Sequence, residues 1–222
     1  YNTQLYNMAG TNVNFKVIDF SEFTSRYRSE ELIGWKFYFI SQMYISSKIT
    51  SEFATWVDSK IQNIALKRKK CLILDLDNTL WGGVLGEEGI NGIQIGGDYP
   101  GKAFLYFQEA LSALSKEGII LSVCSKNNEE DVFEAWEQNP FMVLRKKDFV
   151  AIRINWNDKA SNIVELSKEL NIGLDSMVFI DDNPAERELV KQTLPMVAVP
   201  DFPKQAYMLP QFFMQLVRDY FE

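Results

Sequence analysis

The stretch of sequence that decides the fold is Leu72-Ile73-Leu74-Asp75-Leu76-Asp77-Asn78-Thr79-Leu80. Its apolar start is typical of a strand that is buried on both faces of a parallel sheet. Such a strand would deliver Asp75 and Asp77 to the sheet edge where open α/β sheets bind ligands. Two carboxylates placed together repel each other unless a cation lies between them. The stretch therefore predicts a hard-metal site, most simply for Mg²⁺, beside a nucleophilic carboxylate.

Three later segments supply groups that suit a phosphate and a metal. A second apolar run ends at Ser125-Lys126-Asn127, whose hydroxyl, ammonium and amide groups match phosphate oxygens. Lys159 lies in the first turn of a predicted helix, where the helix start already favours anions. A third apolar run ends at the paired carboxylates Asp181 and Asp182. Each group is thus expected at a strand tip or a helix start.

In this order, the motifs resemble those of haloacid dehalogenase-like (HAD-like) phosphotransferases, namely Asp75-x-Asp77-x-Thr79, Ser125, Lys159 and Asp181-Asp182. The chain resembles the FkbH-like subfamily more narrowly, over roughly residues 68–221, through Leu74–Gly89, Ser125–Asn127, Asn155-Trp156, Lys159 and Phe179–Arg187. An isolated Asp-x-Asp motif would be weak evidence. Four ordered motifs are a specific signal, because motif and expected structural context agree.

The resemblance implies a catalytic role for three residues. Asp75 would be the nucleophile that forms an aspartyl-phosphate. Asp77 would act as general acid and then as general base, with its main-chain carbonyl on the metal. Lys159 would neutralise charge on the transferred phosphoryl group. Lys147 competes for this role, but it belongs to a basic run that is typical of a solvated surface.

The remaining motif residues are assigned to the metal and the phosphate. Asp181 and Asp182 would complete the Mg²⁺ site with Asp75 and Asp77, one binding directly and the other through water; the sequence does not decide which. The candidate phosphate-binding residues are Thr79, Ser125, Lys126 and Asn127, and stabilisation of the loop is an equal alternative for Thr79.

FkbH-like proteins are associated with taking a glyceryl group from 1,3-bisphosphoglycerate and passing it to an acyl carrier protein in polyketide biosynthesis. The resemblance therefore implies this activity and this partner. A thioester relay would need a cysteine near the site, and Cys124 directly precedes Ser125. Alternation along a strand instead predicts that Cys124 faces the core as a small apolar residue. The two interpretations of Cys124 remain open at this point.

Two other functions compete with glyceryl transfer. The first is a plain phosphatase that acts on a small phosphorylated metabolite or a phosphoprotein. The second is a non-catalytic domain that binds a partner, but no essential motif residue is missing. A receiver-type signalling domain also clusters aspartates with a lysine, but its usual arrangement differs from the one in this chain.

Composition fits a HAD-like enzyme and excludes several other classes. The chain has 222 residues, 46% of them hydrophobic, a net charge of −7, two cysteines and no histidine. The negative charge argues against nucleic acid or an anionic membrane as a partner. The absence of histidine excludes catalytic triads based on histidine and His-ligated zinc. Two cysteines without metal-type spacing, and no signal peptide or spanning apolar run, predict a cytoplasmic protein.

The chain is predicted to have two parts. Residues 1–67 should contain a strand near 15–20 and one long helix near 38–66, and they resemble the end of a preceding domain. Residues 68–222 should form a HAD-like catalytic domain, a three-layer α/β sandwich with a mostly parallel Rossmannoid sheet. We expect strands near residues 70–75, 118–124, 149–154, 177–181 and 195–199, and helices near 100–117, 129–138, 158–170, 184–192 and 203–221.

A glycine-rich insert follows the first motif at residues 82–89. Glycines at this density suit tight turns, so the insert is expected to form a small hairpin that acts as a flap. It is too short for a large cap domain. The site should therefore be open enough for a bulky or protein-borne substrate. Trp81, directly before the insert, is a candidate wall of the site.

Overall fold

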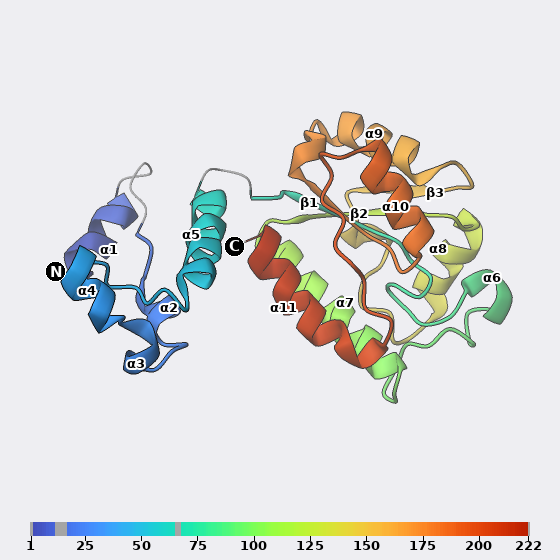
Figure 1. Cartoon of the computed structure of the whole chain (residues 1–222). Helices are drawn as coiled ribbons and strands as arrows, with labels where there is room; N and C mark the ends of the chain where they lie inside the picture. Colours follow the sequence, from blue (N-terminus) through green and yellow to red (C-terminus); the bar gives the residue numbers. More distant parts are fainter. Residues whose placement is uncertain (1, 12–16, 65–67, 222) are drawn as a thin grey trace. The chain divides into compact units, whose positions relative to one another are not determined.

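The computed structural model describes residues 2–11, 17–64 and 68–221 (Figure 1). The chain divides into two compact units, residues 1–67 and residues 68–222, and each is described here by itself. Within the described ranges, no helix combines the length and the apolar character needed to cross a lipid bilayer.

The first unit is built from short helices: α1 (Asn2–Thr11), α2 (Ser21–Thr24), α3 (Ser29–Leu32), α4 (Trp35–Ser41) and α5 (Thr50–Ile64). Phe23, Ile49 and Trp56 form a small core of their own. The rings of Phe23 and Trp56 lie 5.4 Å apart between centroids. This unit therefore has a small core, but other large apolar side chains, among them Trp35, Phe39 and Ile40, are exposed.

The single helix predicted over residues 38–66 is wrong, because two helices occupy this region. Helix α4 ends where Gln42 adopts a left-handed conformation with φ of 57°, which is a common way to terminate a helix. Ile45 then pairs with Ile33 before α5 begins. Apolar periodicity did not reveal this break, because Met43, Tyr44 and Ile49 lie between the two helices and continue the near-helical spacing.

Two predictions for the first unit fall partly outside the described residues. The short strand was predicted over residues 15–20, of which 15 and 16 are not described. Residues 17–20 form no strand. The last two residues of the predicted long helix, 65 and 66, also lie outside the described ranges.

The second unit contains a parallel four-stranded sheet in the order β3-β2-β1-β4. The strands are β1 (Cys71–Leu74), β2 (Ile120–Ser125), β3 (Ala151–Ile154) and β4 (Met177–Ile180). The helices are α6 (Leu85–Glu88), α7 (Gly101–Lys116), α8 (Glu129–Gln138), α9 (Lys159–Leu170), α10 (Pro184–Thr193) and α11 (Leu209–Tyr220), with 3₁₀ turns η1 (Lys146–Asp148), η2 (Leu174–Ser176) and η3 (Ala206–Met208). The predicted α/β architecture is confirmed.

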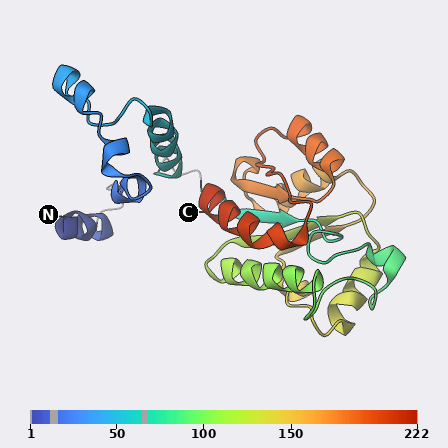
Figure 2. The same ribbon diagram turned by 60° about the horizontal axis from the view of Figure 1, so that its bottom comes forward.

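Alternate residues of β1 face two helical layers, because successive side chains of a strand point to opposite sides. Leu72 and Leu74 share a core with α7, α8 and α11, whereas Cys71 and Ile73 share a core with α9 and α10. Figure 2 shows the two groups of helices on opposite faces of the sheet. All four side chains are fully buried, which explains the uninterrupted apolar run in the sequence.

The fifth strand predicted over residues 195–199 is wrong. Of these residues, Ala198 alone forms a bridge, which joins it to Val178 of β4. The segment lies between Pro195 and Pro200. Because proline has no backbone N–H, neither residue can extend a hydrogen-bonded ladder.

The predicted helices over 100–117, 129–138, 158–170 and 184–192 match α7 to α10 closely at both ends. The helix predicted near 203–221 starts later than expected. It begins at Leu209, after the turn η3, and has Pro210 in its first turn. Proline is well suited to that position because its missing N–H has no partner in a helix start.

Residues 75–100 connect β1 to α7, and all of them are described. They form a flap without a large cap domain, as predicted. The expected hairpin is reduced to one antiparallel pair, in which Gly82 and Gln94 exchange backbone hydrogen bonds of 3.0 and 2.7 Å. Between them the chain forms the short helix α6 instead of two strands, with Leu85 buried.

A buried amide on α7 anchors the loop that follows β1. Gln108 is fully buried, and its Nε2 donates to the carbonyl oxygen of Leu80 at 2.8 Å. Its Oε1 accepts from the backbone N–H groups of Val143 at 3.1 Å and Leu144 at 3.0 Å. One side chain thus pairs three backbone groups from two distant segments.

We expect Gln108→Leu to lower the free energy of unfolding by about 2–4 kcal/mol, because it leaves these buried backbone groups without partners. Urea unfolding of both proteins measures the change. Gln138→Leu is the matched control, since Gln138 is exposed and its amide donates to the exposed Glu134, and it should change stability by less than about 0.5 kcal/mol. Equal losses in the two variants would contradict the anchoring role.

Candidate active site

The site lies at the carboxyl edge of the sheet. Leu74, the last residue of β1, pairs with Val123 of β2 and with Ile180, the last residue of β4, so β1 and β4 end together while β2 continues to Ser125. Asp75 and Asp181 therefore leave the sheet side by side, and the N–H of Asp75 donates to the carbonyl oxygen of Ile180 at 3.0 Å. Strand register alone brings these two carboxylates together.

Lys159 is the first residue of α9 and reaches into this edge. Its Nζ lies 2.9 Å from Oδ1 of Asp75 and 2.5 Å from Oδ2 of Asp181, and its side chain is 4% exposed. Asp158 caps α9 by accepting from the N–H of Ser161 at 2.8 Å. Burial by itself would lower the pKa of Lys159. The carboxylates of Asp75 and Asp181 raise this pKa by a larger amount, so it lies above its ordinary value. Lys159 is therefore a buried, permanent cation.

Three carboxylates surround this lysine. One oxygen each from Asp75, Asp181 and Asp182 lies within 4.8 Å of the others. Burial, and after it the charge of Asp75, raise the pKa of Asp181 and of Asp182 to about 6 each. The single charge of Lys159 thus leaves the cluster with a surplus of negative charge. Hard carboxylate oxygens with unrelieved repulsion fit a divalent cation such as Mg²⁺.

Asp77 is held by three hydrogen bonds. Its Oδ1 accepts from Nε1 of Trp81 at 2.9 Å and from the N–H of Leu85 at 3.0 Å. Its Oδ2 accepts from Nδ2 of Asn127 at 2.9 Å. Burial raises the pKa of Asp77, although the hydrogen bonds from Leu85 and Trp81 oppose this. The flap thus orients this carboxyl group, because Leu85 begins α6.

A cavity of about 350 Å³ opens over these groups. The predicted residues that line it are Asp75, Asp77, Ser125, Lys126, Lys159, Asp181 and Asp182. Ser125 comes from the end of β2 and is almost fully buried at the cavity wall. The competitor Lys147 is an exposed residue of η1 and does not line the cavity.

Two predicted phosphate-binding residues do not line this cavity. Thr79 is fully buried, and its Oγ1 has no hydrogen-bond partner among the described residues. Asn127 is also buried and uses its Nδ2 to hold Asp77. The structure therefore places Thr79 in the loop interior and Asn127 behind the candidate general acid. Trp81 is fully buried, is not among the residues that line the cavity, and donates from Nε1 to Oδ1 of Asp77.

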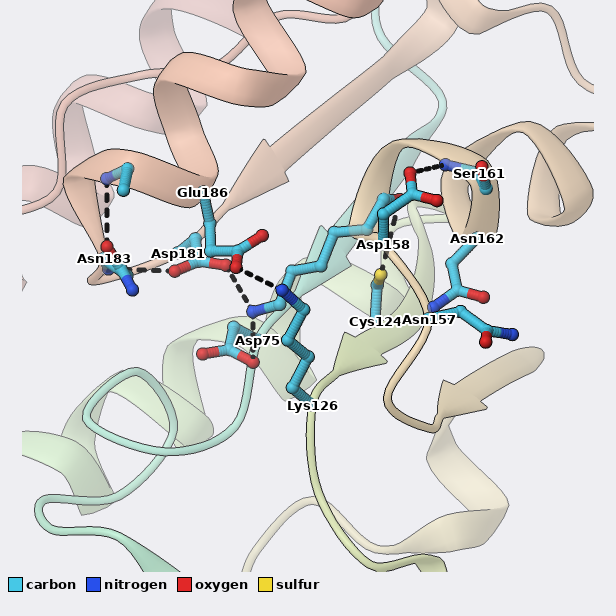
Figure 3. Close-up of polar contacts among 12 residues, drawn as sticks. Asp75, Cys124, Lys126, Asn157, Asp158, Ser161, Asn162, Asp181, Asn183 and Glu186 are labelled. Atoms are coloured by element: carbon cyan, nitrogen blue, oxygen red, sulfur yellow. Dashed lines mark hydrogen bonds and ion pairs between the residues drawn. The ribbon is translucent and has the colours of Figure 1, made fainter.

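Lys126 and Glu186 form an ion pair at the rim of the cavity. Lys126 Nζ lies 2.5 Å from Oε1 of Glu186, and Figure 3 shows the pair beside Asp75 and Asp181. Both residues line the cavity. The other oxygen of Glu186, Oε2, is buried and has no partner among the described residues. Lys126 is therefore held at the entrance by a partner from α10.

Glu186 and Arg187 belong to the site as well, although neither is among the site residues predicted from the sequence. Nη1 of Arg187 donates to the carbonyl oxygens of Asp181 and Asp182, at 2.8 Å each. Arg187 thus fixes the backbone that presents both carboxylates. The proximity of Glu186 and Lys126 had no sequence signal, because the two residues are separated by 60 positions.

Cys124 faces away from the cavity. It is fully buried in the core formed with α9 and α10, and its Sγ donates to the carbonyl oxygen of Lys159 at 3.8 Å. Burial raises the pKa of its thiol to about 12. A thioester relay requires an accessible thiolate. The geometry therefore does not support that role for Cys124.

We expect neither cysteine to react with iodoacetamide in the folded chain at pH 8. Burial also raises the pKa of Cys71, to about 11. Both thiols have a higher pKa in the folded chain than in the unfolded chain. Their contribution to the free energy of unfolding is therefore complete below the ordinary thiol pKa, and it is lost as the pH rises toward the pKa values of the folded chain. Intact mass after labelling, with and without urea, measures both thiols; rapid labelling of Cys124 without urea would contradict the buried placement.

Comparisons with known proteins find similarity to phosphatases. The family model described as NLI interacting factor-like phosphatase matches residues 70–208. A crystal structure of the N-terminal part of protein BF1531 from Bacteroides fragilis, containing a phosphatase domain complexed with Mg, is 39% identical with a TM-score of 0.80. The match covers 100% of this chain and 58% of that one. This chain therefore spans less than two thirds of that relative.

A more distant match shows the fold alone. The HAD domain of effector protein Lem4 from Legionella pneumophila is 16% identical, with a TM-score of 0.50. The match covers 69% of this chain and 97% of that domain. No protein of curated function matches the sequence.

Proposed function

Because the chain belongs to the NLI interacting factor-like phosphatases of the HAD-like superfamily, we propose that it is a Mg²⁺-dependent phosphatase with Asp75 as its nucleophile. One observation carries this proposal. Asp75 lies at a strand tip beside a buried cation, Lys159, and within 4.8 Å of Asp181 and Asp182. The Mg-bound relative that is 39% identical over the whole chain supports the choice of metal.

In the first step, Oδ of Asp75 attacks the phosphorus of a phosphate ester and the bond to the leaving oxygen breaks. Lys159, whose Nζ lies 2.9 Å from Oδ1 of Asp75, stabilises the charge on the transferred phosphoryl group. Ser125, at the cavity wall, donates its hydroxyl to a phosphate oxygen. Asp77 gives its proton to the leaving oxygen, and the burial that raises its pKa favours the protonated state needed for this transfer.

In the second step, Asp77 has become a carboxylate and acts as general base. It removes a proton from a water molecule that attacks the aspartyl-phosphate, which releases inorganic phosphate and regenerates Asp75. Trp81, Asn127 and the N–H of Leu85 keep this carboxylate oriented in both steps. The flap therefore contributes to catalysis through Asp77.

Asp75, Asp182 and the main-chain carbonyl of Asp77 would hold the Mg²⁺ ion, with Asp181 in a second layer. Both oxygens of Asp181 are already engaged, Oδ2 by Lys159 and Oδ1 by the N–H of Asn183 at 2.9 Å. Asp182 is therefore the better direct ligand. When bound, the ion neutralises the repulsion between the nucleophile and the phosphate.

A finer function follows from the resemblance to FkbH-like proteins. In this version the donor is 1,3-bisphosphoglycerate, and the glyceryl unit passes to an acyl carrier protein. The match of residues 74–89 and 179–187 to the subfamily motifs supports it. The buried state of Cys124 does not, because the acyl group would need another route to the carrier thiol. Plain hydrolysis needs no residue beyond those in the cavity.

Both cysteines of the chain, Cys71 and Cys124, are free thiols, which is consistent with a cytoplasmic site of action.

The test has two stages. Release of phosphate from 4-nitrophenyl phosphate should require Mg²⁺ and stop with EDTA. The chain is then incubated with 1,3-bisphosphoglycerate, with and without a phosphopantetheinylated carrier protein, and both proteins are weighed as intact masses. Phosphate release without carrier loading supports the plain phosphatase, and a glyceryl group on the carrier supports transfer. No turnover of any phosphate ester by the folded, Mg²⁺-bound chain would favour the non-catalytic function.

A further inference from the structure

A second cavity adjoins the catalytic one within the second unit. Its volume is about 580 Å³, compared with about 350 Å³ for the catalytic cavity. Asn78, Asp182 and Pro184 line both cavities, so the two meet across these residues. Pockets of about 300–1,000 Å³ accommodate drug-sized ligands. A substrate whose phosphate lies at Asp75 therefore has space for a large group beyond Asp182.

Apolar side chains form part of the wall of this second cavity. Phe104 comes from α7, Phe202 from the segment before η3 and Leu209 from the start of α11. All three are anchored in the core, with exposures of 7%, 9% and 1%. The cavity therefore has fixed walls that suit an aromatic or branched aliphatic group.

The charges of the second cavity favour an anion. Among the described residues that line it, the cations are Arg187 and Lys204, and the single carboxylate is Asp182. Asp182 is already assigned to the metal. Nε of Arg187 is buried and has no hydrogen-bond partner among the described residues. Lys204 is exposed at the wall and is free to approach a bound anion.

We infer that this cavity binds the leaving group of the substrate, and that the substrate is a phosphate monoester whose leaving group combines an apolar body with a second anionic group. This inference rests on the proposed phosphatase function. The bond between Oδ of Asp75 and phosphorus forms as the bond to the leaving oxygen breaks. That oxygen takes the proton of Asp77, and the released alcohol or phenol stays in the second cavity until it dissociates.

Three esters test the inference: phenyl phosphate, 2-naphthyl phosphate and 6-carboxy-2-naphthyl phosphate. With Mg²⁺ present, kcat/KM should rise about tenfold from phenyl to naphthyl, because the second ring is removed from water. It should rise about threefold more with the carboxylate, which is typical of a partly exposed ion pair. Both effects are read as ratios between substrates for the same protein.

Two variants locate the effects in the cavity. Ala206→Leu adds atoms to the lining and should reduce the naphthyl-to-phenyl ratio about tenfold. Lys204→Gln removes a cation and should abolish the threefold gain from the carboxylate. Ala113→Leu and Lys116→Gln are matched controls at exposed positions of α7 outside the lining, and they should leave both ratios unchanged.

The outcomes separate the two proposals. Hydrolysis of phenyl phosphate with ratios near one, or ratios that both variants leave unchanged, would overturn the leaving-group site while the phosphatase function stands. If no ester is hydrolysed, the phosphatase function fails, and fluorescence titration with the product 6-hydroxy-2-naphthoate tests the cavity alone. Binding that weakens in Ala206→Leu and Lys204→Gln supports the cavity, whereas absent or unaffected binding overturns it.

Discussion

Replacing Asp75 with asparagine is expected to reduce hydrolysis of phosphate esters by about a thousand-fold or more. Asparagine has nearly the same size as aspartate, but its neutral amide cannot form the acyl-phosphate bond. The variant should stay folded, because Lys159 keeps its contact with Asp181 at 2.5 Å. Steady-state phosphate release measures the loss. Acid-quenched intact mass should show a phosphoryl group on the wild-type chain and none on the variant.

Asp98→Asn is the matched control for this experiment. Asp98 is exposed and lies outside both cavities, so its substitution changes the net charge equally without touching the site. The control should retain full activity. If Asp75→Asn kept more than a tenth of the wild-type rate, another group would have to be the nucleophile or the water would attack directly.

Replacing Lys159 with methionine is expected to lower the free energy of unfolding by about 3–5 kcal/mol in EDTA, the usual cost of removing one partner from a buried ion pair. The lysine lies between Asp75 and Asp181, both of them buried, and its removal leaves their repulsion unopposed. Activity should also fall by about a hundredfold or more, because the charge on the transferred phosphoryl group loses its counter-ion.

Magnesium should reverse part of this stability loss. The three carboxylates carry more unopposed negative charge in the variant, so Mg²⁺ should raise its melting temperature by more than it raises that of the wild type. Urea unfolding and thermal melts, each with EDTA and with excess Mg²⁺, measure the effect. Lys168→Met, at an exposed position of the same helix, should change little. Equal destabilisation of the two variants would show that the buried ion pairs contribute no net stability.

The sequence predicted the sheet well because β1, β2 and β4 are buried on both faces and therefore read as continuous apolar runs. The helix ends of α8, α9 and α10 were also readable, since Asn128, Asp158 and Asn183 each cap a helix with the side chain. The prediction of secondary structure failed where a single turn residue or a proline interrupts a regular spacing of apolar residues. Gln42 ends a helix within one apolar pattern, and two prolines prevent a strand at residues 195–199.

Motif membership predicted the site better than it predicted individual side-chain positions. Asp75, Ser125 and Lys159 all line one cavity, as expected. Thr79 and Asn127 belong to the same motifs and do not. A difference of one residue along a loop decides whether a side chain points to the ligand or into the core. The spacing of motif residues does not specify the backbone dihedral angles of a loop.

The sequence by itself determined the fold class and the HAD-like superfamily, and it predicted candidate residues for the chemistry, because these depend on local patterns: buried runs, helix caps and motif order. The tertiary structure decided what surrounds that chemistry. It placed Glu186 against Lys126, set Cys124 in the core and joined α7, α10 and the segment before α11 into a second cavity. Those arrangements depend on contacts between residues far apart in the chain, and such contacts leave no periodic signal in the sequence.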